Sequence, residues 1–204
     1  MSQSLLDLSA EAAVTAAALT AAGEHDRLRV AAETLVRRGA TARDLREAIY
    51  IASLFCGFPR GVAALAALDE LDPEAYHTDH PPATRNEARV RGETLFRRLH
   101  KATADRQLRM LAQLHPDFAE TVLSEAYGRV LSRSFLALEV RELVGVTVLT
   151  VLGLDRQLRA HLSAAHNAGV TWDAIAETVA QAAQWGGIDA EPAMATLARL
   201  RATT

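Results

Sequence analysis

The sequence repeats itself at a fixed separation of 130 positions. The segment GATARDLREAIYIASLFCG, which starts at Gly39, aligns without a gap with GVTWDAIAETVAQAAQWGG, which starts at Gly169. The alignment extends over residues 14–63 and 144–193. Alanine matches carry little weight in a chain that is roughly a fifth alanine, so the glycine and threonine matches matter most: Gly23 with Gly153, Gly39 with Gly169, Thr41 with Thr171 and Gly57 with Gly187. We therefore predict two related modules that superpose as a pseudo-twofold pair. The alternative is two helical hairpins that are alike only in composition.

Each module is expected to be a series of helices separated by short turns. Gly39 and Gly169 stand where a helix would end on a left-handed residue, and Thr41 and Thr171 stand where the next helix would begin. Strong helix formers dominate the composition, aromatic residues make up only 5% of the chain, and no alternating strand pattern is evident. The fold class is therefore predicted to be all-α, with two related helical modules packed as a pseudo-dimer.

The chain is expected to divide into three parts. Residues 1–70 form a degenerate copy of the repeat, residues 71–83 form a proline-rich linker, and residues 84–204 form a complete module. The complete module begins with helices that the first copy lacks, over residues 85–100, 103–114 and 116–131.

Polar residues that differ between the two copies are the candidates for chemistry. Glu142 lies in an apolar segment opposite Ala12, and His161 lies opposite Ala31. Arg133 also has no arginine counterpart in the first copy. This pattern predicts one active copy and one scaffold copy, with Glu142 and His161 in contact across neighbouring helices. The alternative is that Glu142 is a helix-start carboxylate and His161 a satisfied core histidine.

The second copy resembles the carboxymuconolactone decarboxylase family, with which alkylhydroperoxidase-D-like proteins are grouped. The residues that carry the resemblance are Arg141, Glu142, Leu143, His161, Ala165, Asn167, Gly169, Thr171, Ile175, Glu177, Trp185 and Gly187. Upstream, Arg91-Gly92-Glu93, Pro116-Asp117-Phe118, Tyr127-Gly128 and Ser132-Arg133 resemble the decarboxylase N-terminal part. The resemblance covers residues 83–200, whereas residues 10–68 resemble only the family core. It implies a homo-oligomer, and a trimer of the fused modules is favoured.

Thiol chemistry is not expected from this chain. The peroxidase-like branch of the family carries a C-x-x-C pair, at positions that here hold Leu154 and Gln157. Cys56 is the single cysteine, and dithiol turnover needs an attacking and a resolving sulfur. We therefore predict neither peroxidase nor disulfide-reductase activity.

The resemblance implies a cofactor-free decarboxylase or lyase that acts on a small carboxylated lactone or related acid. Such chemistry needs a proton donor, a donor to the developing oxyanion and a cation for the substrate carboxylates. His161, Glu142 and Arg133 are predicted to be catalytic, and Arg159 and Asn167 to bind substrate, without a metal or cofactor. The alternatives are a non-catalytic accessory protein of the same fold and another proton-transfer enzyme.

Charge and cysteine content limit the partners and the compartment. The formal net charge is −3, which does not favour nucleic acid or an anionic membrane as a partner. The uncharged apolar run of residues 143–154 is too short to span a bilayer, and residues 1–10 lack the basic start of a secretory signal. The single cysteine fits a reducing compartment, so a cytoplasmic location is expected.

Overall fold

The protein is all-α, as predicted. The computed structural model describes residues 4–69, 71 and 84–203, and none of these residues lies in a strand. The α-helices are α1 (Leu8–Ala22), α2 (His25–Arg37), α3 (Ala42–Cys56), α4 (Phe58–Ala67), α5 (Arg85–His100), α6 (Ala104–Leu114), α7 (Pro116–Thr121), α8 (Leu138–Val151), α9 (Asp155–Ala168), α10 (Trp172–Gly186) and α11 (Glu191–Arg201). A 3-10 turn, η1 (Lys101–Thr103), and a π-helix, η2 (Val122–Leu131), complete the order. Among the described helices, none combines the length and apolar character that crossing a membrane requires.

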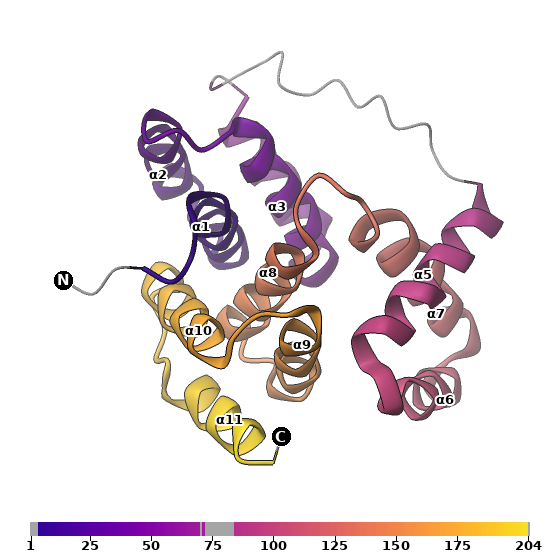
Figure 1. Cartoon of the computed structure of the whole chain (residues 1–204). Helices are drawn as coiled ribbons and strands as arrows, with labels where there is room; N and C mark the ends of the chain where they lie inside the picture. The colour runs from indigo at the N-terminus through magenta and orange to yellow at the C-terminus, as the bar shows by residue number, and fades with distance from the viewer. Residues whose placement is uncertain (1–3, 70, 72–83, 204) are drawn as a thin grey trace. The chain divides into compact units, whose positions relative to one another are not determined.

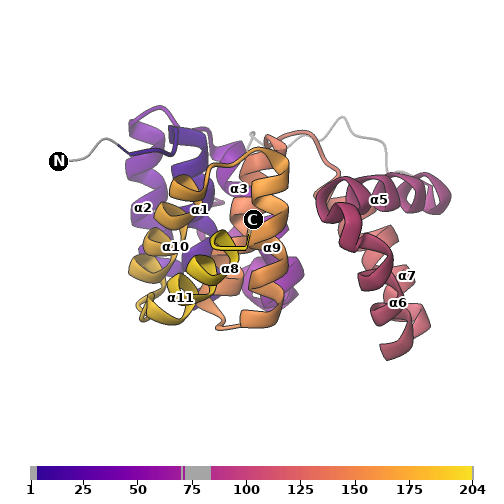
Figure 2. The same ribbon diagram turned by 60° about the horizontal axis from the view of Figure 1, so that its bottom comes forward.

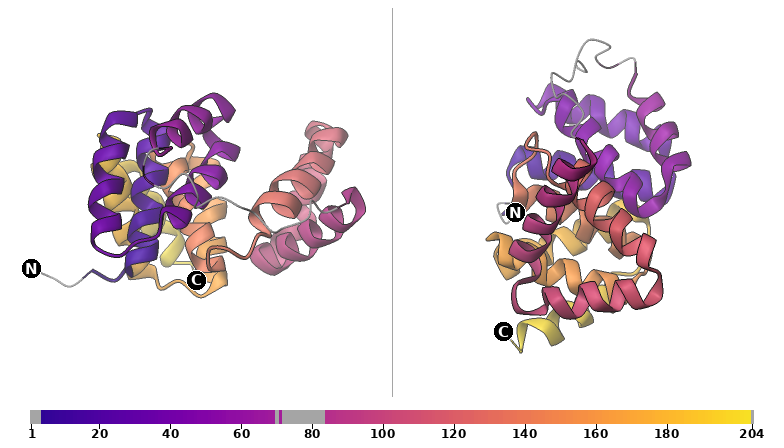
Figure 3. Two further views of the ribbon diagram at one scale, coloured as in Figure 1. Left: turned by 90° about the horizontal axis from the view of Figure 1, so that it is seen from above. Right: turned by 90° about the vertical axis from the view of Figure 1, so that its right-hand side faces the viewer.

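The helices form two compact units whose boundaries differ from the predicted modules. The first unit combines residues 1–77 with 135–204, and the second holds residues 78–134. The predicted module 84–204 is thus divided, because α8–α11 pack with the first repeat and α5–η2 pack with each other. Apart from Leu71, the predicted linker 71–83 lies outside the described residues. Figure 2 shows the helices of the first unit, and Figure 3 shows those of the second in magenta to salmon.

The first unit has the helix order of a pseudo-twofold pair. The helices α1, α2 and α3 start at Leu8, His25 and Ala42, and α8, α9 and α10 start 130 positions later. The packing of the helices is equivalent as well (Figure 1). Helices α1 and α8, which correspond to each other in the two repeats, pack together at the pseudo-twofold axis. Helix α1 also contacts α10 of the second repeat, and α8 makes the corresponding contact with α3 of the first. The predicted common helix order over residues 14–63 and 144–193 is therefore confirmed.

The two axial helices form the centre of the first unit. Every residue from Ala12 to Ala21 in α1 is buried, and so is every residue from Glu142 to Thr150 in α8. A helix that is apolar on all sides must be covered on all sides, and one repeat alone offers too few helices to do this. This requirement explains why α8–α11 join the first repeat.

The helix ends repeat in detail. Gly39 and Gly169 have φ values of 104° and 117°, a conformation that glycine adopts without a steric penalty. In each copy the next helix is then capped by a threonine. The side chain of Thr41 accepts a hydrogen bond from Asp44 N at 3.0 Å, and that of Thr171 accepts one from Ala174 N at 3.2 Å. The two predicted N-caps are thus confirmed.

We expect Thr41→Ala and Thr171→Ala each to lower the free energy of unfolding by about 1 kcal/mol, because each leaves one first-turn amide without its acceptor. Chemical denaturation of each variant measures the loss. Thr34→Ala is the control, since Thr34 is exposed within α2 and caps nothing, and its change is expected to stay within about 0.5 kcal/mol. A large effect at one cap alone would contradict equivalent roles in the two copies.

In the second unit, α5 and η2 cross at very close range. A Cβ atom on Gly92 would lie 1.8 Å from Leu123 O, and one on Gly128 would lie 2.0 Å from Ala88 O, so only glycine fits at both positions. The helix predicted over 85–100 is confirmed as α5. The helix predicted over 116–131 is present, but it begins as α7 and continues as the π-helix η2.

Candidate functional site

Glu142 and His161 form a buried hydrogen-bonded pair in the first unit. Glu142 Oε2 lies 3.1 Å from His161 Nδ1, which confirms the predicted contact between the two side chains. The Glu142 side chain is 1% exposed, whereas that of His161 is 11% exposed. His161 is therefore the more accessible member of the pair.

The turn at Gly153 brings the two residues together. Glu142 lies on α8 and His161 on α9, and these helices pack side by side on either side of the turn. Gly145, less than one turn after Glu142, makes room for the imidazole. A Cβ atom at Gly145 would lie 2.9 Å from His161 Nδ1, closer than real Cβ contacts. In the first copy, Thr15 occupies the equivalent position.

A third helix, which belongs to the first repeat, contacts the Glu142–His161 pair. The ring of Phe55, on α3, meets the ring of His161 edge to face, with centroids 5.2 Å apart. The site is therefore built from both repeats. Sequence reasoning missed both Phe55 and Gly145. One signal was available for each: Phe55 is the repeat counterpart of Trp185, and Gly145 lies inside an apolar helix where no turn needs a glycine.

The hydrogen bond between Glu142 and His161 involves only one of the two ring nitrogens, Nδ1, so Nε2 is not engaged by the carboxyl group. The second carboxylate oxygen, Oε1 of Glu142, is buried and has no hydrogen-bond partner among the described residues. A buried acceptor without a partner is costly to the folded state.

The other predicted site residues are not gathered at this pair within the first unit. Arg159 is exposed on α9 and lies two residues before His161, and residues at that spacing point to different sides of a helix. Asn167 is half-buried in the last turn of α9. Arg133 follows η2 and belongs to the second unit. In the part of the chain that the structure describes, no three His, Cys, Asp or Glu side chains gather as a metal site.

The two positions at which the peroxidase-like branch carries its C-x-x-C pair lie at the start of α9. Leu154 directly precedes α9 and Gln157 lies in its first turn, one helical turn before His161. Cys56 ends α3 in the other repeat. Burial raises the pKa of the Cys56 thiol above its ordinary value and outweighs the nearby Arg60, which acts in the opposite direction.

We expect Cys56 to be a poor nucleophile at neutral pH, because the raised pKa keeps the thiol protonated. Its alkylation by iodoacetamide at pH 7 should be slower than that of free cysteine, and it should accelerate as the pH rises through the raised pKa. A peroxide-consumption assay with an added dithiol should show no turnover that Cys56→Ser removes. Turnover abolished by Cys56→Ser would contradict this and would move the active site to the first repeat.

Comparison with known families shows to which family the chain belongs. Residues 1–70 and 116–200 match the model of the carboxymuconolactone decarboxylase family. The chain belongs to this family. The match includes both repeats, whereas residues 84–115, which sequence analysis assigned to the complete module, lie outside the two matched segments.

Two curated relatives are similar to parts of the chain. The 4-carboxymuconolactone decarboxylase of Acinetobacter baylyi is 36% identical over 89 residues, which are 44% of this chain and 66% of that protein. Peroxisomal protein 2 of Schizosaccharomyces pombe is 28% identical over 134 residues, which are 64% of this chain and 63% of that protein. The matched region is thus less than two thirds of the length of each relative.

Proposed function

We propose that the protein is a decarboxylase that acts on a small carboxylated lactone or related acid without a cofactor. The observation that carries the proposal is the buried Glu142–His161 pair, in which the imidazole is the accessible member. Membership of the carboxymuconolactone decarboxylase family and the similarity to a 4-carboxymuconolactone decarboxylase support it. The chain has a single thiol, and burial raises its pKa, so thiol peroxidase chemistry is a poor alternative.

The proposed reaction breaks one carbon–carbon bond. The bond to the departing carboxylate cleaves, CO2 leaves, and the electron pair passes into the lactone carbonyl, so that the ring itself is the electron sink. His161 then delivers the proton on Nε2 to a ring carbon, while Glu142 holds Nδ1 and stabilises the charged imidazole before the transfer.

The substrate carboxylates need a cation. We propose Arg133 for this role and Arg159 as a second cation, because guanidinium groups bind carboxylates in a bidentate manner. We propose Asn167 as a further contact to substrate, since its side-chain amide can donate a hydrogen bond to a carboxylate. We expect Arg133→Gln and Arg159→Gln each to raise the KM for the carboxylated substrate, which steady-state kinetics measure. A variant with unchanged KM and kcat would remove that arginine from the proposal.

Assays with the purified full chain test the reaction. The protein is incubated with 4-carboxymuconolactone and with related carboxylated butenolides, and CO2 release is measured. In D2O, each product molecule should gain one deuterium at the protonated carbon. Thermal-shift measurements with the same compounds run in parallel. Binding without CO2 release would favour another proton-transfer reaction, and neither binding nor turnover across the panel would favour the accessory alternative.

We also propose that the protein acts as a homo-oligomer, with a trimer of the fused modules favoured, and that it works in the cytoplasm. Phe58 and Val62 support an interface, because they lie one turn apart on α4 and are both strongly exposed. Analytical ultracentrifugation tests the assembly and cell fractionation tests the location. A monomer at micromolar concentration would contradict the first part of this proposal.

A further inference from the structure

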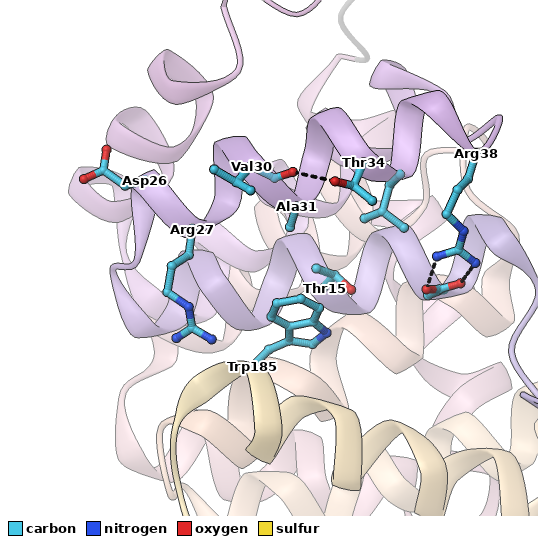
Figure 4. A pocket seen from close by; sticks show the side chains of 10 residues that line it. Thr15, Asp26, Arg27, Val30, Ala31, Thr34, Arg38 and Trp185 are labelled. Carbon is cyan, nitrogen blue, oxygen red and sulfur yellow. Dashed lines mark hydrogen bonds and ion pairs between the residues drawn. The ribbon is translucent and has the colours of Figure 1, made fainter. Parts of the chain in front are cut away.

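The first repeat contains a pocket of about 470 Å³ within the first unit. It opens between α1 and α2, and Trp185 of α10 reaches into it from the other repeat (Figure 4). Its volume lies in the range of about 300–1,000 Å³ that is usual for small-molecule sites. The lining residues that matter here are Glu11, Arg27, Val30, Ala31, Arg38 and Trp185.

This pocket is the pseudo-symmetric counterpart of the Glu142–His161 site. A shift of 130 positions converts Ala31 into His161 and Trp185 into Phe55. In the second repeat, the imidazole of His161 lies against Phe55. In the first repeat, the equivalent place beside Trp185 holds only the methyl group of Ala31, so the space stays open. Helices α2 and α9 lie on opposite sides of the α1–α8 pair, so the two sites are separate (Figure 1).

The charged residues of the pocket differ from the residues at the equivalent positions of the second repeat. Arg27 corresponds to Gln157, and its guanidinium lies 5.9 Å from the centroid of the Trp185 ring. Among the described residues, no ion pair engages Arg27, whereas Arg38 is held by both carboxylate oxygens of Glu11, at 2.5 and 2.7 Å. Asp26 points away from Trp185 (Figure 4). Arg27 is therefore the cation that remains available to a ligand beside the indole.

We propose that this pocket binds a flat, mainly apolar monocarboxylate. The ligand's ring stacks against Trp185 and the wall formed by Val30 and Ala31, and its carboxylate pairs with Arg27. Ala12 and Ala31 replace the Glu142 and His161 of the other copy, so the site binds without proton transfer. This second site goes beyond the proposed decarboxylase function and does not depend on it.

The test is an NMR titration of the full chain with 2-naphthoate. The chain has two tryptophans, so an ¹⁵N-labelled sample gives two indole N–H signals, and Trp172→Phe assigns them. We expect the Trp185 signal to move in a saturable manner, with a Kd below about 1 mM, while the Trp172 signal stays in place. Neutral 2-naphthylmethanol should bind about 10-fold more weakly or worse, because it cannot form the charged pair with Arg27. No saturable movement of the Trp185 signal, or equal affinity for the acid and the alcohol, would overturn the proposal.

Matched variants locate the cation. Arg27→Gln should weaken 2-naphthoate binding by about 10- to 100-fold. Arg29→Gln is the control, since Arg29 lies on the same helix, pairs with Glu33 and does not line the pocket. The affinity of this variant for 2-naphthoate should stay within about 2-fold of that of the original protein. Unchanged binding by Arg27→Gln would contradict the assignment. His161→Gln should leave the Trp185 titration intact, so a failure of the decarboxylase proposal and a failure of this one are distinguishable.

Discussion

His161→Gln is expected to lower kcat for decarboxylation by about 10²- to 10⁴-fold, the usual worth of a positioned proton donor. Glutamine retains a hydrogen-bonding side chain but cannot deliver a proton from Nε2. Glu142→Gln should lower kcat as well, because a neutral amide stabilises the charged imidazole less than a carboxylate does. Steady-state kinetics on the substrate found in the CO2-release assay measure both losses.

His166→Gln is the matched control for this prediction. His166 lies on the same helix, stacks on Trp172 and has Nδ1 3.1 Å from Val170 O, away from the Glu142–His161 pair. Its replacement should leave kcat per folded molecule within about 3-fold of the original. If His161→Gln retained the full kcat, His161 would be a core histidine and the proposed mechanism would be wrong.

Gly145→Ala is expected to lower kcat by about 10²-fold while the fold persists. The new methyl group would lie 2.9 Å from His161 Nδ1, so the imidazole must move and its hydrogen bond to Glu142 must lengthen or break. Alanine is also the better helix former by about 1 kcal/mol, which offsets part of the steric cost to stability. Kinetics measure the loss of turnover, and the NMR signals of the His161 ring report its displacement.

Val146→Ala separates this effect from simple destabilisation. Val146 is fully buried in the same helix, so its truncation should lower the free energy of unfolding by about 1–3 kcal/mol and leave kcat per folded molecule nearly unchanged. Gly145→Ala should show the opposite pattern, with a large loss of kcat per folded molecule and a small change in the free energy of unfolding. If both variants lost turnover in proportion to their stability, Gly145 would have no specific role in positioning His161.

The sequence predicted those parts of the fold that depend on local interactions. Left-handed glycines and threonine caps act within four or five residues, so the repeat of Gly39 and Thr41 at Gly169 and Thr171 was enough to place the ends of the helices. The unit boundaries could not be found in this way. They follow from the burial of α1 and α8 on all sides, and the set of helices that covers them is a property of the tertiary structure.

In the candidate site, too, the contact between neighbouring helices could be predicted from the sequence and the contact between the two repeats could not. The contact between Glu142 and His161 followed from the turn between two adjacent helices. Phe55 reaches the site from the other repeat, more than 100 residues away in the chain, so local patterns could not place it. The family motif also included Glu177 without indicating its contacts. Its carboxylate accepts hydrogen bonds from Ser4 Oγ at 2.5 Å and Leu5 N at 2.8 Å, which lower its pKa and tie residues 4 and 5 to α10.

The placement of α1 has a consequence for synthesis on the ribosome. This helix contacts α2, α3 and α4 of its own repeat, but the rest of its surface is covered by α8 and α10, which start 130 positions or more after the start of α1. At a translation rate of about 5–20 residues per second, the nascent chain carries a partly uncovered alanine-rich helix for roughly 7–26 s before α8 is made. The helices α5 to η2, which pack as their own unit, are synthesised during this interval. The first repeat therefore completes its folding only after the second unit has been translated, and during that time it is exposed to chaperones and to neighbouring nascent chains.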